Sequence, residues 1–224
     1  MSTPENRPLP SPRALLALLV LALAFGIGLG IVARGPNVLN IDVELTGAIQ
    51  RMQGGPLPAL ADLGNLLGST AWAAVAIAVG LALAALARAK AELAFLAVLL
   101  ALRLGATQLK PVFASPRPTD DLVTIVGSWE GSGYPSGHAL TASTMALGLA
   151  VIAWRWIPAR KVAIGTVILL LALALLIGWA RVWSGAHWAT DVLGGYAFGT
   201  AIAAGATLVL VRMTPREAID TDLP

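Results

Sequence analysis

The sequence predicts an all-α, polytopic membrane protein with six transmembrane helices and short interfacial helices between the first two. Hydrophobic residues make up 57% of the 224 residues, and charged residues make up only 12%, about half the share found in soluble domains. The mean hydropathy is +0.79. Long apolar segments recur along the chain, and each can cross a bilayer as a helix with a rise of about 1.5 Å per residue.

The length of the chain leaves room for one membrane domain, which we expect at residues 14–212. The polar segments 1–13 and 213–224 are expected to be disordered cytoplasmic tails. The chain contains no cysteine, which excludes disulfides, thiolate catalysis, cysteine-bound zinc and a lipoprotein anchor. The net charge of +3 and the pI near 9.8 come mostly from basic residues in short loops, where such residues set membrane topology. No nucleic-acid partner is therefore expected.

Residues 14–33 carry no charge and are expected to form the first span. This segment is longer than the apolar part of a usual signal peptide and lacks a clean A-x-A cleavage site, which favours a retained helix over a cleaved signal. Residues 34–68 mix apolar and charged residues and are broken by the GGP segment at 54–56 and by Pro58. We expect two short amphipathic helices there, at the interface or against the bundle. They either frame the access of a lipid substrate or simply connect the spans.

Residues 69–87 and 93–109 are expected to form the second and third spans. The third span contains Arg103, a residue that is costly inside a membrane. Because Arg103 lies seven residues before Lys110, the two are expected on one helix face. Arg103 either supports a polar site or extends along the helix to the membrane interface, and the second interpretation is favoured.

A polar segment at 110–136 follows, in which three prolines are expected to prevent a regular helix. The remaining spans are expected at 137–154, 162–180 and 188–211. Between the fourth and fifth spans, tryptophans and basic residues at 154–161 form a pattern that is typical of a membrane interface.

Six spans would place both termini on one side of the membrane. The basic residues on that side are Arg7, Arg13, Arg88, Lys90, Arg155, Arg160, Lys161, Arg212 and Arg216. The basic residues on the opposite side are Arg34, Arg51, Lys110, Arg117 and Arg181. Because cytoplasmic loops carry an excess of lysine and arginine, the side with both termini is predicted to be cytoplasmic, in a bacterial cytoplasmic membrane.

Three polar clusters are then expected to meet at the extracytoplasmic face. They are Lys110-PVFASP-Arg117-Pro118, Tyr134-Pro135-Ser136-Gly137-His138 and Arg181-VWSGA-His187-WAT-Asp191. Three cations beside one carboxylate predict an anionic ligand, because guanidinium groups match phosphate oxygens and a lysine adds a point charge. Ser136 is a good N-cap, and the unpaired backbone N–H groups of the helix that starts at Gly137 would add to the anion site.

His187 and Asp191 are spaced i, i+4 and therefore share one helix face. The carboxylate would fix the imidazole tautomer and leave the other ring nitrogen as a nucleophile or base. His138 comes from a different helix start and could act as general acid to the leaving oxygen. This pattern predicts phosphoryl transfer through a phosphohistidine, with charge stabilised by the cations. A zinc site would need three or four ligands, and the basic neighbours would repel the ion, so neither a metal nor a cofactor is expected.

The three clusters resemble the signature of the type 2 phosphatidic acid phosphatase superfamily, the lipid phosphate phosphatases, which reads K-x6-RP, PSGH and SR-x5-H-x3-D. One position departs from it, because Ala180 stands where the family usually has serine; this departure leaves the expected activity intact. The resemblance implies that His187 is the nucleophile, Asp191 its orienting partner and His138 the acid. It implies phosphate binding by Lys110, Arg117, Ser136, Gly137 and Arg181. Soluble haloperoxidases share the signature, but six spans argue against that branch.

The expected function is hydrolysis of a phosphate monoester or pyrophosphate on a lipid of the outer leaflet. Undecaprenyl pyrophosphate is the favoured substrate, followed by phosphatidylglycerol phosphate or phosphatidic acid, although this order is an analogy at the level of the fold. A phosphotransferase of the same family would form the same intermediate and stays open as an alternative. A non-catalytic transporter or anion-binding membrane protein is the alternative from another class. The oligomeric state is left open.

Overall fold

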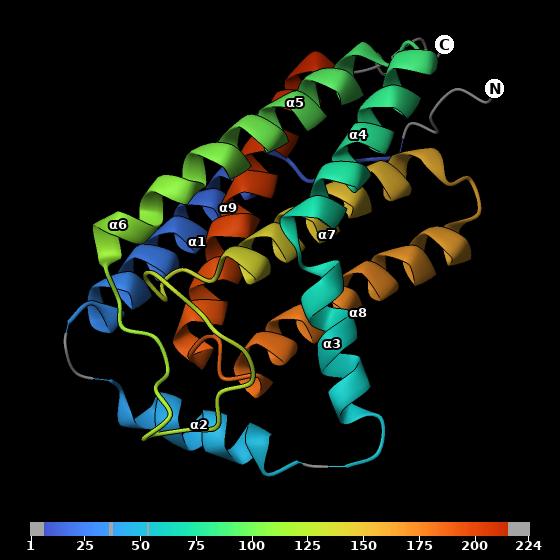
Figure 1. The fold of residues 1–224 in the computed structure, drawn as a ribbon. Helices are drawn as coiled ribbons and strands as arrows, with labels where there is room; N and C mark the ends of the chain where they lie inside the picture. Colours follow the sequence, from blue (N-terminus) through green and yellow to red (C-terminus); the bar gives the residue numbers. More distant parts are fainter. Residues whose placement is uncertain (1–6, 36–37, 53, 215–224) are drawn as a thin grey trace, which may run out of the picture.

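The computed structural model describes residues 7–35, 38–52 and 54–214, and all of its regular elements within these ranges are helices (Figure 1). The fold-class prediction of an all-α protein is therefore confirmed. In chain order the helices are α1 (Pro12–Ala33), α2 (Asn40–Gln50), α3 (Leu57–Leu67), α4 (Thr70–Leu86), α5 (Lys90–Gly105), the 3-10 turn η1 (Ala106–Gln108), α6 (Leu109–Phe113), α7 (Gly137–Trp156), α8 (Arg160–Trp183) and α9 (Ala189–Met213).

Five helical segments in the described part of the chain are long and apolar enough to cross a membrane. They are Pro12–Ala33, Lys90–Phe113, Gly137–Trp156, Arg160–Trp183 and Ala189–Met213. A sixth is reached if α3 and α4, which meet at a bend of 53°, form one broken span. The multi-span character is therefore confirmed, while the count of six spans stays a prediction.

Helix α9 lies at the centre of the bundle and packs against α1, α5 and α7. Its buried face is built largely from glycine, alanine and threonine. Small side chains allow helices to approach closely in a membrane, where lipid tails compete with apolar side chains for contact and dispersion provides much of the attraction. Helices α1 and α8 turn more of their surface outward, as expected for helices that face lipid.

The helix that carries Lys110 runs further than the sequence predicts. The prolines were expected to stop regular structure at residue 110, but α5 continues through η1 into α6 and ends only at Phe113. Pro111 has no N–H to donate and its ring crowds the preceding turn, and the tighter 3-10 turn at 106–108 lies where this distortion falls. The helix stops at Ala114, which adopts a left-handed conformation with φ of 48°.

The first described residues contact the turn between α7 and α8, since Arg7 donates a hydrogen bond to the carbonyl of Pro158 and lies over the ring of Trp154. Of the tail expected at 1–13, residues 1–6 lie outside the described part, and α1 already begins at Pro12. The tail expected at 213–224 is described only to residue 214. Figure 1 shows the α4–α5 turn at one end of the bundle and α2, with the 114–136 loop, at the other.

Candidate active site

The three polar clusters of the sequence meet at the end of the bundle that carries α2. The 114–136 loop leads into α7, and a short turn at 184–188 connects α8 to α9. The Ser136 N–H donates to the carbonyl of Asp191 over 2.9 Å, and the Arg117 guanidinium donates to the carbonyl of Ala186 over 2.6 Å. Residues 69 positions apart in the chain therefore border one site.

Aromatic rings beside this site hold the end of the 114–136 loop in place. Tyr134 is fully buried, and its ring lies 5.1 Å from that of Phe113 and 6.3 Å from that of Phe198, measured between centroids. Its hydroxyl donates to the carbonyl of Gly26 in α1. Because Tyr134 directly precedes the Pro-Ser-Gly-His segment, its packing between α1 and α9 places the start of α7 beside α9.

His187 and Asp191 form the predicted pair. The Nδ1 atom of His187 lies 3.1 Å from Oδ2 of Asp191, and the backbone N–H of Trp188 donates to the same oxygen over 3.1 Å. His187 is 2% exposed and Asp191 is 0% exposed. Because a carboxylate accepts hydrogen bonds, this contact favours the tautomer with a proton on Nδ1 and a lone pair on Nε2.

Arg117 lies on the other side of the same imidazole. Its Nη1 atom is 3.4 Å from Nε2 of His187, and its Nε donates to the carbonyls of Glu130 and Gly131. An arginine N–H is always a donor, so Nε2 faces it as an acceptor. Burial lowers the pKa of His187 well below its usual value, and the charges of Arg117, Arg181 and Lys110 lower it further. The imidazole is therefore neutral at physiological pH.

The other two predicted cations approach the site from α6 and α8. Lys110 Nζ donates to the carbonyl of Ser132 over 3.0 Å. Arg181 donates from Nη1 to Oδ1 of Asn65 over 2.8 Å, and its guanidinium lies 4.1 Å from the ring centroid of Trp129. Within the described residues, the buried Nε of Arg181 has no hydrogen-bond partner. A buried donor without an acceptor is rare in proteins and fits a site for an anionic ligand.

The start of α7 has the geometry expected for an anion site. Ser136 is the N-cap, and its hydroxyl accepts from the N–H of Ala139 over 3.5 Å. A Cβ atom added to Gly137 would meet no other atom within 4 Å, so the first turn opens onto free space. His138 follows and lies within electrostatic range of Arg181, His187 and Lys110.

Arg103 points into the protein, although extension to the membrane interface was the favoured interpretation. Its Nε donates to the hydroxyl of Thr141 over 2.8 Å, and its Nη2 lies 3.5 Å from the carbonyl of Gly137. That interpretation was therefore wrong. Thr141 and Gly137 both lie in the first two turns of α7, which offer Arg103 the hydrogen-bond partners that lipid would lack.

Two residues that contact Arg181, Asn65 and Trp129, were not assigned a role from the sequence. Asn65 belongs to α3, and Trp129 belongs to the 114–136 loop. A polar residue within the apolar segment 57–67 was a usable signal for Asn65. Ala180, at the position where a serine was expected, packs against α3: a Cβ on Gly64 would lie 2.7 Å from that of Ala180. This close approach brings Asn65 to Arg181.

The assembled groups can bind a tetrahedral anion and attack it with a neutral imidazole. Three cations and an open helix start surround the ring nitrogen that Asp191 leaves free, and charge that develops on oxygen would meet fixed donors. Within the described residues, no group of three or more histidine, aspartate or glutamate side chains lies close enough to hold a metal ion.

Known proteins share the sequence pattern and the fold of this chain. The family model of the PAP2 superfamily matches residues 73–215. An undecaprenyl-diphosphatase of Sulfolobus acidocaldarius is 34% identical over 87 residues, a match that spans 38% of this chain and 32% of that relative. The crystal structure of a PAP2-type phosphatidylglycerolphosphate phosphatase from Bacillus subtilis aligns with a TM-score of 0.77 at 22% identity, over 88% of this chain and 97% of that one. Aquifex aeolicus LpxE aligns with a TM-score of 0.60 at 22% identity, over 75% and 96% of the two chains.

Proposed function

Because the chain belongs to the PAP2 superfamily, we propose that it is a metal-independent lipid phosphatase that hydrolyses its substrate through a phosphohistidine at the extracytoplasmic face of a bacterial cytoplasmic membrane. The observation that carries this proposal is the environment of His187. Asp191 holds one nitrogen of a buried, neutral imidazole, while Arg117 faces the other. A neutral ring nitrogen beside fixed cations suits attack on a phosphate ester.

In the proposed first step, Nε2 of His187 attacks phosphorus while the bond from phosphorus to the leaving oxygen breaks. His138 gives its proton to that oxygen, and the phosphoryl group stays on His187. In the second step, water attacks the phosphohistidine, His138 takes the proton of that water, and inorganic phosphate leaves. Lys110, Arg117, Arg181 and the backbone N–H groups after Ser136 would hold the phosphate oxygens throughout.

Undecaprenyl pyrophosphate is our first choice of substrate. The relative from Sulfolobus acidocaldarius, an undecaprenyl-diphosphatase, supports this choice, although the match covers only a part of both chains. Phosphatidylglycerol phosphate is the second choice because the structurally similar Bacillus subtilis protein is a phosphatidylglycerolphosphate phosphatase, and phosphatidic acid is the third. Transfer of the phosphoryl group to another lipid would use the same first step and differs only in the acceptor. A transporter would bind phosphate without releasing it from an ester.

Phosphate release from purified protein in detergent tests the proposal. We expect release from at least one of undecaprenyl pyrophosphate, phosphatidylglycerol phosphate and phosphatidic acid. His187→Ala is expected to lower kcat by at least about 10⁴-fold because it removes the group that forms the intermediate. Substantial residual turnover in a folded His187→Ala protein would contradict the nucleophile assignment. Release by neither protein would favour the transporter.

Activity is also expected to survive chelation, because cationic side chains take the place of a metal in the proposed mechanism. The measurement compares phosphate release before and after incubation with excess EDTA, followed by dialysis. Orthovanadate, a tetrahedral phosphate analogue, is expected to inhibit the same preparation at millimolar concentration or below. Loss of activity with EDTA and its recovery with a divalent ion would contradict the metal-independent mechanism.

A further inference from the structure

Helix α2 buries polar residues and exposes apolar ones, the reverse of a helix that packs on an apolar core. Its three buried residues are polar and spaced i, i+4, i+8: Asp42, Thr46 and Gln50. Its exposed residues include Ile41 and Leu45. Burying a carboxylate is costly unless the group is hydrogen-bonded, so the partners of this polar face show what α2 contributes.

Asp42 supplies the cap of α9. Its Oδ1 accepts from the backbone N–H of Thr190 over 2.9 Å, and its Oδ2 accepts from the Thr190 hydroxyl over 2.6 Å. The residue at the N-cap position of α9 is Trp188, whose side chain has a donor and no acceptor. The exposed N–H groups of the first turn need an acceptor, and Asp42, 148 residues earlier in the chain, provides it.

The capped turn carries the charge that orients the nucleophile. Thr190 directly precedes Asp191, whose Oδ2 contacts both the imidazole of His187 and the N–H of Trp188. Asp42 itself is 2% exposed, and its carboxylate oxygens accept hydrogen bonds from Thr190, not from the imidazole or its neighbouring cations, within the described residues. Asp42 also lies within electrostatic range of Asp191, so a variant that removes its charge but keeps an acceptor separates an effect of charge from an effect on the position of the first turn of α9.

The opposite end of α2 holds the neighbouring segments. Gln50 pairs with Thr124 of the 114–136 loop in both directions: its Nε2 donates to the Thr124 carbonyl over 2.7 Å, and its Oε1 accepts from the Thr124 N–H over 3.0 Å. The same Nε2 also donates to the carbonyl of Trp183 at the end of α8 over 3.1 Å. One face of α2 thus contacts α9, the loop and α8, the three segments that border His187.

We propose that Asp42 is a positioning residue for the phosphatase reaction: by capping α9 through Thr190, it holds Asp191, and through it His187, in the geometry needed for attack. The inference rests on the proposed function of the site and adds α2 to the groups that set its rate. At the other end of the same helix, the hydrogen bonds of Gln50 to Thr124 and Trp183 hold α2 against the site.

Steady-state kinetics of two Asp42 variants test the proposal in the full-length protein. The substrate is whichever of undecaprenyl pyrophosphate, phosphatidylglycerol phosphate and phosphatidic acid the wild-type protein hydrolyses fastest. Asp42→Ala is expected to lower kcat by about 10- to 100-fold, the size of effect that a small misplacement of a reacting group produces. KM is expected to stay within about threefold, because the phosphate-binding cations lie on other segments. Asp42→Asn keeps an acceptor for the Thr190 N–H and is expected to restore kcat to within about threefold of wild type.

Glu44→Ala is the matched control, since it removes an exposed carboxylate from the same helix. Rates are compared per monodisperse protein after size-exclusion chromatography. A kcat of Asp42→Ala within twofold of that of Glu44→Ala would overturn the proposal, and so would an equal loss in Asp42→Asn and Asp42→Ala. If Asp42→Ala does not fold, Thr190→Val decides: it removes the 2.6 Å bond, and unchanged kcat would overturn the proposal.

The failure of the proposed function has a different signature. In that case the wild-type protein releases phosphate from none of the three lipids, and the kcat values of the variants cannot be compared. Hydrogen–deuterium exchange then measures the cap directly, with faster exchange expected at residues 189–192 in Asp42→Ala than in Glu44→Ala. Equal exchange in the two variants would show that Asp42 does not hold the first turn of α9.

Discussion

His187 owes its proposed reactivity to being buried between a carboxylate and a guanidinium. Its Nδ1 contacts Asp191, and its Nε2 faces Arg117. A second proton on the ring would be placed beside three cations in a site that water scarcely reaches, so burial and charge both favour the neutral form. Neutral imidazole is the form with a lone pair to attack phosphorus.

The sign of this pKa shift gives a testable prediction. Because the pKa of His187 is lowered from 6.5, the folded protein should keep the imidazole neutral at pH values below 6.5, where a solvent-exposed histidine is largely protonated. The chain has two histidines, so His138→Ala with a histidine-free tag leaves His187 as the single imidazole. Its ¹⁵N spectrum in detergent, recorded between pH 5 and 8, reports the titration.

The same variant unfolded in denaturant serves as the reference and should titrate near the ordinary value. A folded-state midpoint at or above 6.5 would contradict the described surroundings of His187. A midpoint below it would agree with a nucleophile that stays neutral in mildly acidic conditions.

The sequence allowed a role in the site to be predicted for some residues and not for others. His187 and Asp191 were predicted because i, i+4 spacing fixes their neighbourhood, and the structure places them 3.1 Å apart. Gly185 was not assigned, yet it adopts φ of +64° and a Cβ there would lie 2.3 Å from the carbonyl oxygen of Thr124. That requirement arises from a segment about 60 residues earlier in the chain, and no local pattern reveals it.

At the scale of the helix, α2 and α3 take part in the site through polar contacts that face inward. The sequence predicted two short helices at 34–68, and the structure has them at Asn40–Gln50 and Leu57–Leu67. Whether they guide a lipid or connect spans could not be decided from the pattern, because apolar and polar residues alternate in both cases. Their partners, Thr190 and Arg181, become visible only when the chain is folded.

Asn65 of α3 gives a prediction at this scale. Its Oδ1 accepts from Nη1 of Arg181 over 2.8 Å, and a hydrogen bond to a charged group contributes about 1.5 kcal/mol or more. If this bond holds the arginine for phosphate binding, Asn65→Ala should raise KM for the lipid phosphate by about tenfold and change kcat little. Steady-state phosphate release measures both values.

Asp62→Ala is the control, because Asp62 lies exposed on the same helix. The assignment of Asn65 would be contradicted by a KM that stays at the wild-type value, or by an equal rise in the Asp62 variant. A fall in kcat alone would point to the nucleophile instead of the phosphate-binding arginine.

Across the whole molecule, the three polar clusters lie at one end of the bundle, the buried Glu92–Arg155 ion pair lies at the other, and apolar surface runs along its length. Helix α9 buries mainly small residues, and the outer helices α1 and α8 leave large apolar side chains, such as Leu21 and Leu175, exposed. This is the arrangement expected of a protein whose solvent is lipid. The bounds of the long apolar helices could be predicted to within a few residues because length and hydropathy suffice for them. The continuation of α5 to Phe113 could not, since the effect of Pro111 depends on how the preceding turn adapts.

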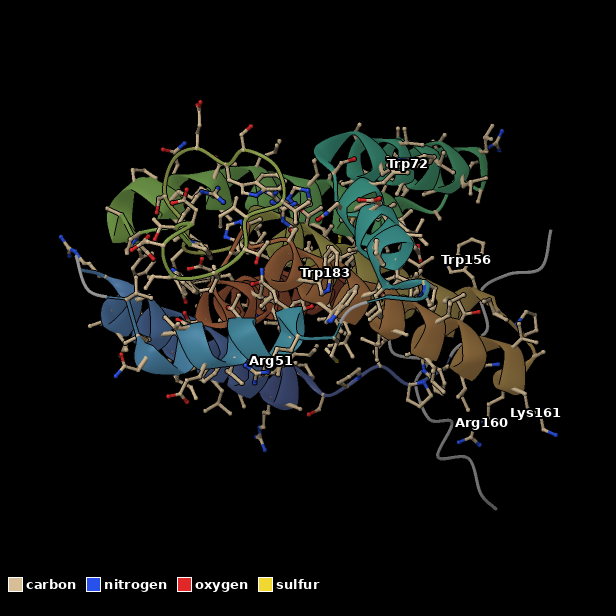
Figure 2. All side chains as sticks on the ribbon, turned by 60° about the horizontal axis from the view of Figure 1, so that its bottom comes forward. Arg51, Trp72, Trp156, Arg160, Lys161 and Trp183 are labelled. Atoms are coloured by element: carbon tan, nitrogen blue, oxygen red, sulfur yellow. The ribbon has the colours of Figure 1, made fainter. Side chains whose placement is uncertain are left out.

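The orientation of the molecule in the membrane is the last prediction. Figure 2 shows Arg160 and Lys161 at one end of α8 and Trp183 at the other, and the candidate site lies at the Trp183 end. The excess of lysine and arginine at the Arg160 end should keep that end in the cytoplasm, which would leave the site outside. Since the chain has no cysteine, a single introduced cysteine is its only thiol, and its labelling reports the side directly.

Ser128→Cys places a thiol in the exposed part of the 114–136 loop, and Ala159→Cys places one at the exposed α7–α8 turn. In intact bacterial cells, a membrane-impermeant maleimide should label the Ser128 variant at once and the Ala159 variant only after permeabilisation. Phosphate release by each variant provides the check that both fold. The reverse pattern would place the site in the cytoplasm, where it could not act on an outer-leaflet lipid, whereas the expected pattern leaves Nε2 of His187 facing the headgroups of that leaflet.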